Sequence, residues 1–334
     1  MQIPVCCFGE ILIDFLQDPQ HDEVFRRFAG GAPANVAVAV AKLGGHSQFM
    51  GMVGADMFGD FLTAQLQQYG VDCQALRKTS LAKTALAFVA LDAHGDRSFS
   101  FYRPPAADLL YLPEDCPPHL WQQPGILHLC SNSLTESAIA ATSFSLVAMA
   151  KAHGWLVSVD ANLRHNLWAE GAANRVLVTQ LLQQADVIKL SDDELVYLAD
   201  SADPQQWLAQ LMASPRPQQD GQTIAPWVVV TAGAAQVQSY SAAGQLQVPV
   251  VPVKVVDTTA AGDSFVGAWL YQLSELFAAG RSWADIGLDC AVQQTLIEKA
   301  VVAGSLTCQR YGAFTALPDS EQWHAAFVSS PDSR

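Results

Sequence analysis

A carboxylate stands inside a turn of small residues, at Asp257-Thr258-Thr259-Ala260-Ala261-Gly262-Asp263. The residues that follow place apolar side chains at spacings of three and four, which is typical of one face of a helix: Phe265, Trp269, Leu273 and Leu276. The first amides of a helix have no partner within it, so small residues there leave a cradle for anions, usually phosphate. A carboxylate beside such a cradle would repel an anionic ligand. The position of Asp263 therefore indicates that it has a chemical task there.

One task that fits Asp263 is to accept the proton of a hydroxyl group that is about to be phosphorylated. The alternative is an ordinary strand–turn–helix corner with an acidic first turn, and the motif alone does not decide between them. Its place at a helix N-terminus predicts a lowered pKa for Asp263, which would make it a weak base. The valines before the turn predict the end of a buried strand: Val250, Val251, Val253, Val255 and Val256.

A second small-residue stretch, Gly30-Gly31-Ala32-Pro33-Ala34-Asn35, also leads into a predicted helix. Its two glycines let the backbone approach a ligand closely, and Pro33 suits the first helical position. Asn35 offers a donor and an acceptor to sugar hydroxyls. A simple loop–helix junction remains an alternative for this stretch.

Asp14 shares a face with Leu12 and Leu16 in a strand expected to continue from residues 3–9. A carboxylate among leucines is costly unless it is paired or used, so Asp14 is a candidate site residue. An acid at an exposed strand end is the alternative.

Strands and helices alternate regularly from residue 126 onward, which predicts an α/β fold with a mostly parallel sheet covered by helices on both faces. The expected strands are 126–130, 156–160, 187–190 and 227–231, and the expected helices are 135–153, 172–185, 263–278, 290–306 and 319–328. Ser191 and Glu194 form a capping box at the start of a further helix. Residues 214–226 predict an exposed loop. Ligands of such sheets bind beyond the carboxyl ends of strands, where Asp14, Asp160, Ser191 and Asp263 are expected.

The segment 84–103 interrupts this rhythm with a predicted hairpin around residues 92–96. We expect it to form a small β lid with part of 12–29, inserted in one domain that spans residues 1–334.

Composition excludes several classes of protein. The 18 basic residues against 32 acidic ones, a net charge of −14, argue against nucleic acid or an anionic membrane as partner. No apolar run reaches the length of a membrane span, and Met1-Gln2-Ile3-Pro4 lacks a basic signal region.

The seven cysteines form no C-x-x-C pair, which suits reduced thiols in the cytoplasm, with Cys6 and Cys7 in the core. The eight histidines show no ligand spacing, so we expect no zinc. The chain has neither G-x-x-x-x-G-K-[ST] nor G-x-G-x-x-G, which excludes a P-loop and weakens a nicotinamide-dependent enzyme.

The chain resembles the ribokinase-like (PfkB) carbohydrate kinase family, and within it the fructokinases. Two signatures carry the resemblance, Gly30–Ala37 and Asp257–Phe265, and shorter matches support it at 9–14, 101–103, 160–164 and 189–195. The resemblance covers nearly the whole chain. It implies a ribokinase-like fold with a small β lid, a homodimer joined through that lid, and an ATP-dependent sugar kinase.

The resemblance also implies roles for single residues. Asp263 would be the catalytic base, Arg164 would lie near the acceptor and the phosphate, and the anion hole would be formed by the amides of Ala260, Ala261, Gly262 and Asp263. The sugar ligands would be Asp14, Gly30, Gly31, Asn35, Phe101 and Arg103. The nucleotide would lie along Lys189, Thr231, Gly233 and Gly262. Glu194 would help to hold Mg²⁺ indirectly, and a monovalent cation such as K⁺ would be bound by Asp257, Thr259 and Gly312.

Two departures from the family pattern concern Ala260, where glycine is usual, and Ser191, where asparagine is usual. If residue 260 needs a positive φ, alanine costs about 1 kcal/mol there. Ser191 is expected to cap its helix, and Ala316 replaces a frequent hydroxyl residue near the cation site.

The expected reaction is the phosphorylation of fructose to fructose 6-phosphate. The alternatives are an aminoimidazole riboside, 2-keto-3-deoxygluconate or ribose kinase, and a non-catalytic sugar-binding regulator.

Overall fold

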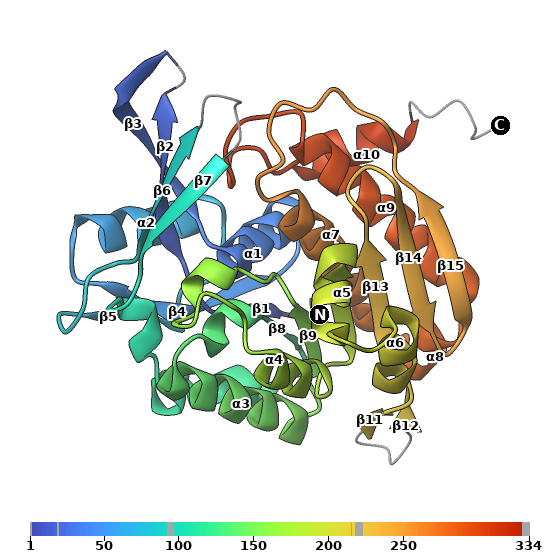
Figure 1. Ribbon diagram of the computed structural model, residues 1–334. Coiled ribbons are helices and arrows are strands. Elements are labelled where there is room, and N and C mark those ends of the chain that lie inside the picture. Colours follow the sequence, from blue (N-terminus) through green and yellow to red (C-terminus); the bar gives the residue numbers. More distant parts are fainter. Residues whose placement is uncertain (1, 19, 92–96, 215, 218–222, 329–334) are drawn as a thin grey trace.

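The computed structural model describes residues 2–18, 20–91, 97–214, 216–217 and 223–328. Within these ranges the main sheet has nine strands in the order β15-β14-β13-β10-β9-β8-β1-β4-β5 (Figure 1). Every neighbouring pair from β13 to β5 is parallel, and β14 and β15 extend the sheet antiparallel. The strands are β1 (Val5–Phe8), β4 (Ser47–Gly54), β5 (Leu76–Thr79), β8 (Ile126–Cys130), β9 (Leu156–Asp160), β10 (Val187–Ser191), β13 (Trp227–Thr231), β14 (Gln236–Ser241) and β15 (Gly244–Pro249).

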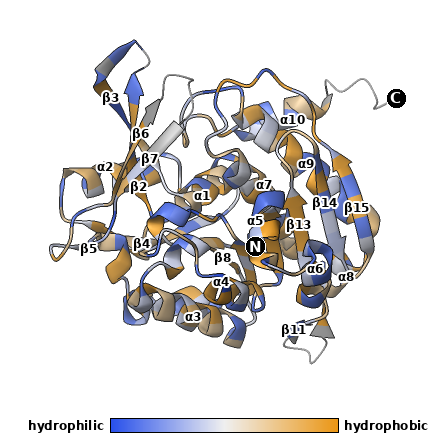
Figure 2. Cartoon of the chain, viewed as in Figure 1, coloured by the Kyte–Doolittle hydropathy of each residue, from blue (hydrophilic) through white to orange (hydrophobic). Residues whose placement is uncertain are grey.

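Helices cover both faces of this sheet, and each face has its own hydrophobic core. Side chains of β1 alternate between the two cores: Val5 and Cys7 face one, and Cys6 and Phe8 face the other. The first core includes α1 (Ala32–Lys42), α2 (Met57–Gln68), α7 (Ala261–Ala278), α8 (Trp283–Gly287), α9 (Cys290–Thr307) and α10 (Ser320–Val328). The second includes α3 (Ser137–Ala152), α4 (Arg175–Leu182), α5 (Asp192–Ala199) and α6 (Pro204–Met212). Figure 2 shows hydrophobic residues along the central strands, whereas the outer end of β3 is hydrophilic.

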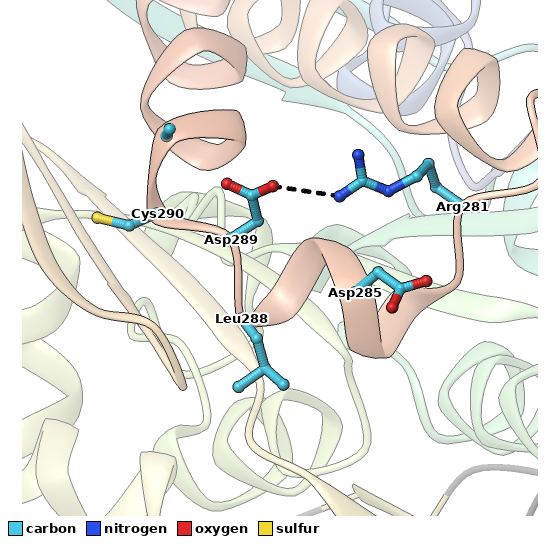
Figure 3. A pocket seen from close by; sticks show the side chains of 6 residues that line it. Arg281, Asp285, Leu288, Asp289 and Cys290 are labelled. Carbon is cyan, nitrogen blue, oxygen red and sulfur yellow. Dashed lines mark hydrogen bonds and ion pairs between the residues drawn. The ribbon is translucent and has the colours of Figure 1, made fainter.

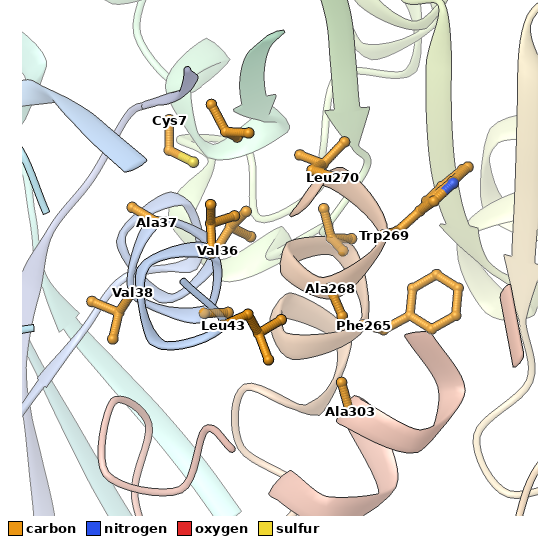
Figure 4. Close-up of a cluster of buried hydrophobic side chains, with 14 of the residues drawn as sticks. Cys7, Val36, Ala37, Val38, Leu43, Phe265, Ala268, Trp269, Leu270 and Ala303 are labelled. Atoms are coloured by element: carbon orange, nitrogen blue, oxygen red, sulfur yellow. The ribbon is translucent and has the colours of Figure 1, made fainter. Parts of the chain in front are cut away.

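Two helices that lie far apart in the sequence, α1 and α7, pack side by side in the first core (Figure 4). A Cβ added at Gly267 of α7 would lie 2.4 Å from the Cβ of Ala39 of α1. The absence of a side chain at Gly267 therefore allows the two backbones to approach, which brings the N-terminal turns of both helices to the same region.

A second sheet projects from the body of the molecule (Figure 1) and has the order β3-β2-β6-β7. It consists of β2 (Leu12–Asp18), β3 (His21–Gly30), β6 (Leu86–Leu91) and β7 (Arg97–Tyr102). β6 and β7 pair as an antiparallel hairpin, and its expected loop at 92–96 lies outside the described residues. The first strand was expected to continue through Asp14, but it ends at Phe8, and Asp14 belongs to the second sheet through its pairing with β3 and β6.

Two expectations for connecting segments are wrong. The valines before the Asp263 turn form no strand, and Val251 and Val255 are exposed by 52% and 58%. The segment 214–226, expected to be an exposed loop, contains β11 (Arg216–Pro217) and β12 (Thr223–Ile224). Arg216 is buried, and its guanidinium donates to the carbonyls of Leu182 and Leu211, which caps the C-terminal ends of α4 and α6.

Among the described residues, no helix is both long enough and apolar enough to span a membrane.

Candidate active site

A cleft of about 530 Å³ opens beyond the carboxyl ends of β1, β9 and β10, and we call it the Asp263 cleft. β1 leads into Glu10, β9 leads into Asn162, and β10 ends at Ser191, all three of which line the cleft. The second sheet contributes Asp14. The chemically active side chains therefore gather at the edge of the sheet where a parallel α/β fold places its ligands.

Asp263 lies in the first turn of α7 and is 7% exposed. Its Oδ2 accepts a hydrogen bond from Nδ2 of Asn35 at 2.7 Å, and its Oδ1 accepts one from Nδ2 of Asn162 at 3.3 Å. Each carboxylate oxygen has two lone pairs, so one on each oxygen is still open toward a ligand in the cleft.

The expected lowering of the Asp263 pKa is wrong. Burial raises the pKa of Asp263 to about 7, and the charge of Asp160 adds to this, while Asn35, Arg164 and Lys189 oppose it. Burial likewise raises the pKa of Asp14 to about 7, together with the charge of Asp263 and against that of Arg164. Loss of hydration thus outweighs the hydrogen bond from Asn35 and the charges of Arg164 and Lys189, and both carboxyl groups titrate where a general base is most effective near neutral pH.

In the turn before Asp263, residue 260 has the backbone conformation that is costly for alanine. Ala260 has φ 60° and ψ 10°, in the left-handed region. The amides of Ala260, Gly262 and Asp263 have no acceptor among the described residues, whereas the amide of Ala261 donates to the carbonyl of Thr258 at 3.3 Å. The turn therefore presents three open donors at the positive end of α7, which suits an anion.

Lys189 supplies a buried cation at the same turn. Its Nζ donates to both carboxylate oxygens of Asp160, at 3.1 and 3.2 Å. Burial alone would lower the pKa of Lys189, but the charges of Asp160 and Glu194 raise it above its ordinary value, so the ammonium stays charged. A Cβ added at Gly262 would lie 3.3 Å from this Nζ, which shows how close the ammonium lies to the open amides.

Glu194 faces the same cleft, and the predicted capping box holds it there. Its Oε2 accepts from the amide of Ser191 at 2.7 Å, while Oγ of Ser191 accepts from the amide of Glu194 at 3.1 Å. Its Oε1 accepts from the amide of Leu163, also at 2.7 Å. No group of three Asp, Glu, His or Cys residues able to hold a metal occurs within the described ranges.

A second pocket, of about 380 Å³, adjoins the Asp263 cleft, and we call it the valine pocket. Its wall includes Thr231, Gly233 and four of the five valines that were expected to form a buried strand: Val250, Val251, Val253 and Val255. Thr258 and Gly262 line both cavities. An apolar pocket and a polar cleft thus meet at the open amides of the Asp263 turn.

The glycines of the second small-residue stretch act by leaving space. A Cβ added at Gly30 would lie 1.9 Å from Oδ2 of Asp14, so only glycine leaves room for that carboxylate. Gly31 has φ 110°, and a Cβ there would lie 2.5 Å from the carbonyl oxygen of Glu10. Both glycines therefore shape the wall of the cleft.

A third hollow, of about 650 Å³, lies on α8 and the start of α9, elements that contribute nothing to the Asp263 cleft (Figure 3). Arg281 and Asp289 pair across it at 3.2 Å between Nη2 and Oδ2. Asp289 also caps α9 by accepting from the amide of Val292, so these charges serve the local structure.

Residues 2–320 match the model of the pfkB family carbohydrate kinases. The chain belongs to this family. It is similar to a fructokinase with bound ATP from Xylella fastidiosa, at 43% identity and a TM-score of 0.90, covering 98% of this chain and 99% of that one. A fructokinase from Vibrio cholerae O395 with fructose, ADP and calcium bound is 35% identical, with a TM-score of 0.84 and coverage of 97% and 98%. An aminoimidazole riboside kinase from Salmonella enterica, complexed with aminoimidazole riboside and an ATP analogue, is 29% identical, with a TM-score of 0.81 and coverage of 98% and 100%.

In this kinase fold, most residues singled out from the sequence fall together. The Asp263 cleft is lined by Asp14, Gly31, Asn35, Phe101, Arg164, Lys189, Glu194, Thr259, Ala260, Gly262 and Asp263. The valine pocket is lined by Thr231, Gly233, Ala261 and Gly262. Lys189 thus faces the cleft and not the pocket. Asp257 lies behind the turn, where its Oδ1 accepts from the amide of Thr259 at 2.8 Å and its Oδ2 from that of Gly312 at 3.2 Å.

Arg103 differs from its expected position. Its guanidinium is buried behind the cleft, where Nε donates to Oδ2 of Asp108 at 2.7 Å and Nη1 donates to the carbonyl of Asn132 at 2.9 Å. Sequence reasoning also missed three buried polar residues of the cleft, namely Glu10, Asn132 and Asn162. Each follows a predicted strand by at most two residues, and that position was the available signal.

Proposed function

We propose that the chain transfers the γ-phosphoryl group of ATP to a hydroxymethyl group of a sugar, most favourably converting fructose to fructose 6-phosphate. The observation that carries this proposal is the junction of the two cavities at Thr258 and Gly262, with the carboxylate of Asp263 beside three open amides. A phosphoryl group bound at these amides would lie between a nucleoside in the valine pocket and a hydroxyl group in the Asp263 cleft.

In the proposed reaction, the sugar hydroxymethyl oxygen forms a bond to the γ-phosphorus while the bond from that phosphorus to the bridging oxygen of ADP breaks. The hydroxyl proton passes to Asp263, whose pKa of about 7 leaves it largely ionised at a slightly alkaline pH. The amides of the turn and the charges of Lys189 and Arg164 offset the negative charge on the transferring group.

The sugar would be held by Asp14, the Gly31 backbone, Asn35 and Phe101, all of which line the cleft. Gly30 would contribute by leaving room for the carboxylate of Asp14, and Arg103 by supporting the cleft from behind. Thr231 and Gly233 would contact the nucleotide along the wall of the valine pocket.

The residues present fit a magnesium ion and a monovalent cation. Mg²⁺ usually keeps several waters and binds substrate phosphates, so Glu194, whose two oxygens already accept backbone amides, would help to hold the ion indirectly through water. Bound there, Mg²⁺ would offset the charge of the triphosphate. For a monovalent cation such as K⁺, the ligands would be oxygen atoms of Asp257 and Thr259 and of carbonyls near Gly312, since the bonds from the amides of Thr259 and Gly312 to Asp257 place these three residues side by side behind the turn.

Fructose is the first choice among acceptors because the two similar fructokinases have 43% and 35% identity to this chain. Aminoimidazole riboside is the second candidate, since the kinase crystallised with it covers 98% of the chain at 29% identity. A coupled assay of ADP release over fructose, aminoimidazole riboside, 2-keto-3-deoxygluconate and ribose, with and without K⁺, tests the choice. We expect the highest kcat/KM with fructose. The absence of any sugar-dependent ADP release would overturn the kinase proposal.

We also propose a homodimer joined through the second sheet. Phe25 and Tyr102 both contact the ring of Phe88 edge-on and are exposed by 37% and 66%, which leaves an aromatic face uncovered on this sheet. Light scattering during gel filtration should give twice the mass of the chain, and Phe25→Ser should shift the protein toward the monomer. A monomer at all concentrations would contradict the proposal.

A further inference from the structure

Glu10 is a buried carboxylate in the wall of the Asp263 cleft that the proposed reaction does not yet use. It is 3% exposed, and its Oε1 accepts hydrogen bonds from the amide of Ala32 at 3.3 Å and from Nδ2 of Asn132 at 3.0 Å. Its Oε2 has no hydrogen-bond partner in the part of the chain that the structure describes. A buried carboxylate oxygen without a donor is unfavourable, and a hydroxyl group of a ligand in the cleft would supply one.

The neighbour of Glu10 shares this property. Oδ1 of Asn132 is also a buried acceptor without a partner among the described residues, and Asn132 lines the same cleft. The side chains of Glu10 and Asn132 are joined by the bond from Nδ2 to Oε1, so their two open acceptors belong to one rigid unit. Sugar hydroxyls are donors, and a pair of fixed acceptors is well suited to them.

This unit is distinct from the group around the catalytic base, although α1 connects the two. The amide of Ala32, at the start of α1, donates to Glu10, while Asn35, three residues later, donates to Asp263. The first turn of α1 therefore binds both of these carboxylates, each of which lines the cleft. Asp263 would face the hydroxyl that reacts, and Glu10 would face a hydroxyl that does not react.

Arg103 and Asp108 hold this unit from behind. Arg103 donates to the backbone carbonyl of Asn132 at 2.9 Å, and its position is fixed by its buried pair with Asp108 at 2.7 Å. Burial raises the pKa of Glu10, whereas the charge of Arg103 and the bond from Asn132 oppose the increase. No hydrogen bond from Arg103 to Glu10 occurs among the described residues, so Oε2 stays without a donor, and Glu10 itself lines the cleft.

We infer that Glu10 is a further substrate-contacting residue, whose Oε2 accepts a hydrogen bond from a sugar hydroxyl other than the one that is phosphorylated. This inference rests on the proposed sugar kinase function and deepens it, because it names a residue that selects among acceptors. A site that has a buried acceptor for a hydroxyl discriminates against the analogue that lacks this hydroxyl.

The test combines Glu10 variants with the 1-deoxy, 3-deoxy and 4-deoxy analogues of fructose, all of which keep the reacting hydroxymethyl group. For the unaltered chain, we expect one analogue to lose about 10- to 100-fold in kcat/KM through the missing bond to Glu10. In Glu10→Ala the penalty for this same analogue should fall to within about threefold, while the penalties for the other analogues persist. Equal penalties in both proteins would show a purely structural role and overturn the inference.

Two further measurements keep the result decisive. Glu298→Ala, the same change at an exposed position on α9, should leave every analogue penalty unaltered. Should Glu10→Ala fail to fold, a crystal structure of the unaltered chain with fructose decides: a sugar oxygen within about 3.2 Å of Oε2 supports the contact, and its absence refutes it. A chain whose ADP release is stimulated by none of the sugars would overturn the proposed function itself, whereas an active chain without the Glu10 coupling would overturn only this inference.

Discussion

Nδ2 of Asn35 donates to Oδ2 of Asp263 at 2.7 Å and so joins the first turn of α1 to the first turn of α7. Both side chains are buried, at 5% and 7% exposure, so water screens this bond little. A hydrogen bond donated to a carboxylate stabilises its charged form and lowers its pKa. Asn35 therefore limits how far burial can raise the pKa of Asp263.

The pH dependence of turnover should reveal this relationship. Asp263 must be ionised to accept a proton, so kcat/KM should fall as the pH drops below about 7, and more steeply if Asp14 must also be ionised. Asn35→Ala removes a bond to the charged form and should move this acid limb upward by about one pH unit. Asn174→Ala, at the exposed cap of α4, is a control that should leave the limb in place. An unchanged limb in Asn35→Ala would contradict the coupling.

Replacing Asp263 with asparagine should stabilise the fold at alkaline pH. The carboxyl group has a pKa of about 7 in the folded chain against an ordinary value of 3.8, so folding is penalised once the unfolded chain ionises. This penalty is absent below the ordinary pKa, grows as the pH rises, and is complete above about 7. Asp263→Asn should therefore raise the free energy of unfolding by on the order of 2 kcal/mol at pH 8 and little at pH 4, as measured by urea denaturation.

Asp285 provides a control with the opposite sign. Bonds from the side chain and amide of Ser282 lower the pKa of Asp285, so its contribution is present above its ordinary pKa and is lost as the pH falls. Asp285→Asn should therefore destabilise at pH 8 and less so at acidic pH. Identical pH trends for the two variants would refute the assigned shifts.

The left-handed conformation of Ala260 predicts a contrast between two neighbouring alanines. Ala260→Gly removes strain of about 1 kcal/mol, which the greater freedom of glycine in the unfolded chain largely offsets, so its stability should be unchanged or slightly higher. Ala261→Gly, at the first position of α7 and without a positive φ, has no strain to release and should cost up to about 0.5 kcal/mol. Urea midpoints at constant slope measure both changes, and equal destabilisation of the two variants would argue against strain at position 260.

Gly30→Ala should impair the sugar site specifically. The new Cβ would lie 1.9 Å from Oδ2 of Asp14, so this carboxylate must move, and a displacement of about 1 Å can reduce activity by about 100-fold. We expect a large increase in the KM for the sugar with an unchanged KM for ATP. Gly287→Ala is the matched control, since its Cβ would lie 3.6 Å from Ile224 in ordinary contact. An increase in the KM for ATP alone would show that Asp14 does not serve the sugar.

Short-range patterns made much of the fold and site predictable. Ser191 and Glu194 form the predicted capping box because its hydrogen bonds join residues only three positions apart. The left-handed turn at residue 260 followed from a position where glycine is usual. The parallel sheet followed from the alternation of strands and helices, which also places polar residues beyond the strand ends.

Properties that depend on distant parts of the chain were not predictable in this way. The valines at 250–255 were expected to be buried in a strand, but they line an open pocket whose opposite wall comes from α7 and α9. The pKa of Asp263 rises because the fold buries it and brings the charge of Asp160, more than 100 positions away in the sequence, near it, which local helix chemistry does not reveal. Arg103 lies behind the cleft because Asp108 and Asn132 fix its guanidinium there, and this pairing depends on the fold.

The role of Asp263 as general base is the central claim, and the turnover of Asp263→Asn tests it most directly. We predict that kcat with fructose falls by about 10²- to 10⁴-fold, since asparagine accepts no proton at neutral pH. Binding of fructose and ADP, followed by calorimetry, should stay within about threefold because the shape of the side chain is kept. An Asp263→Asn variant that turns over fructose near the unaltered rate would contradict the account.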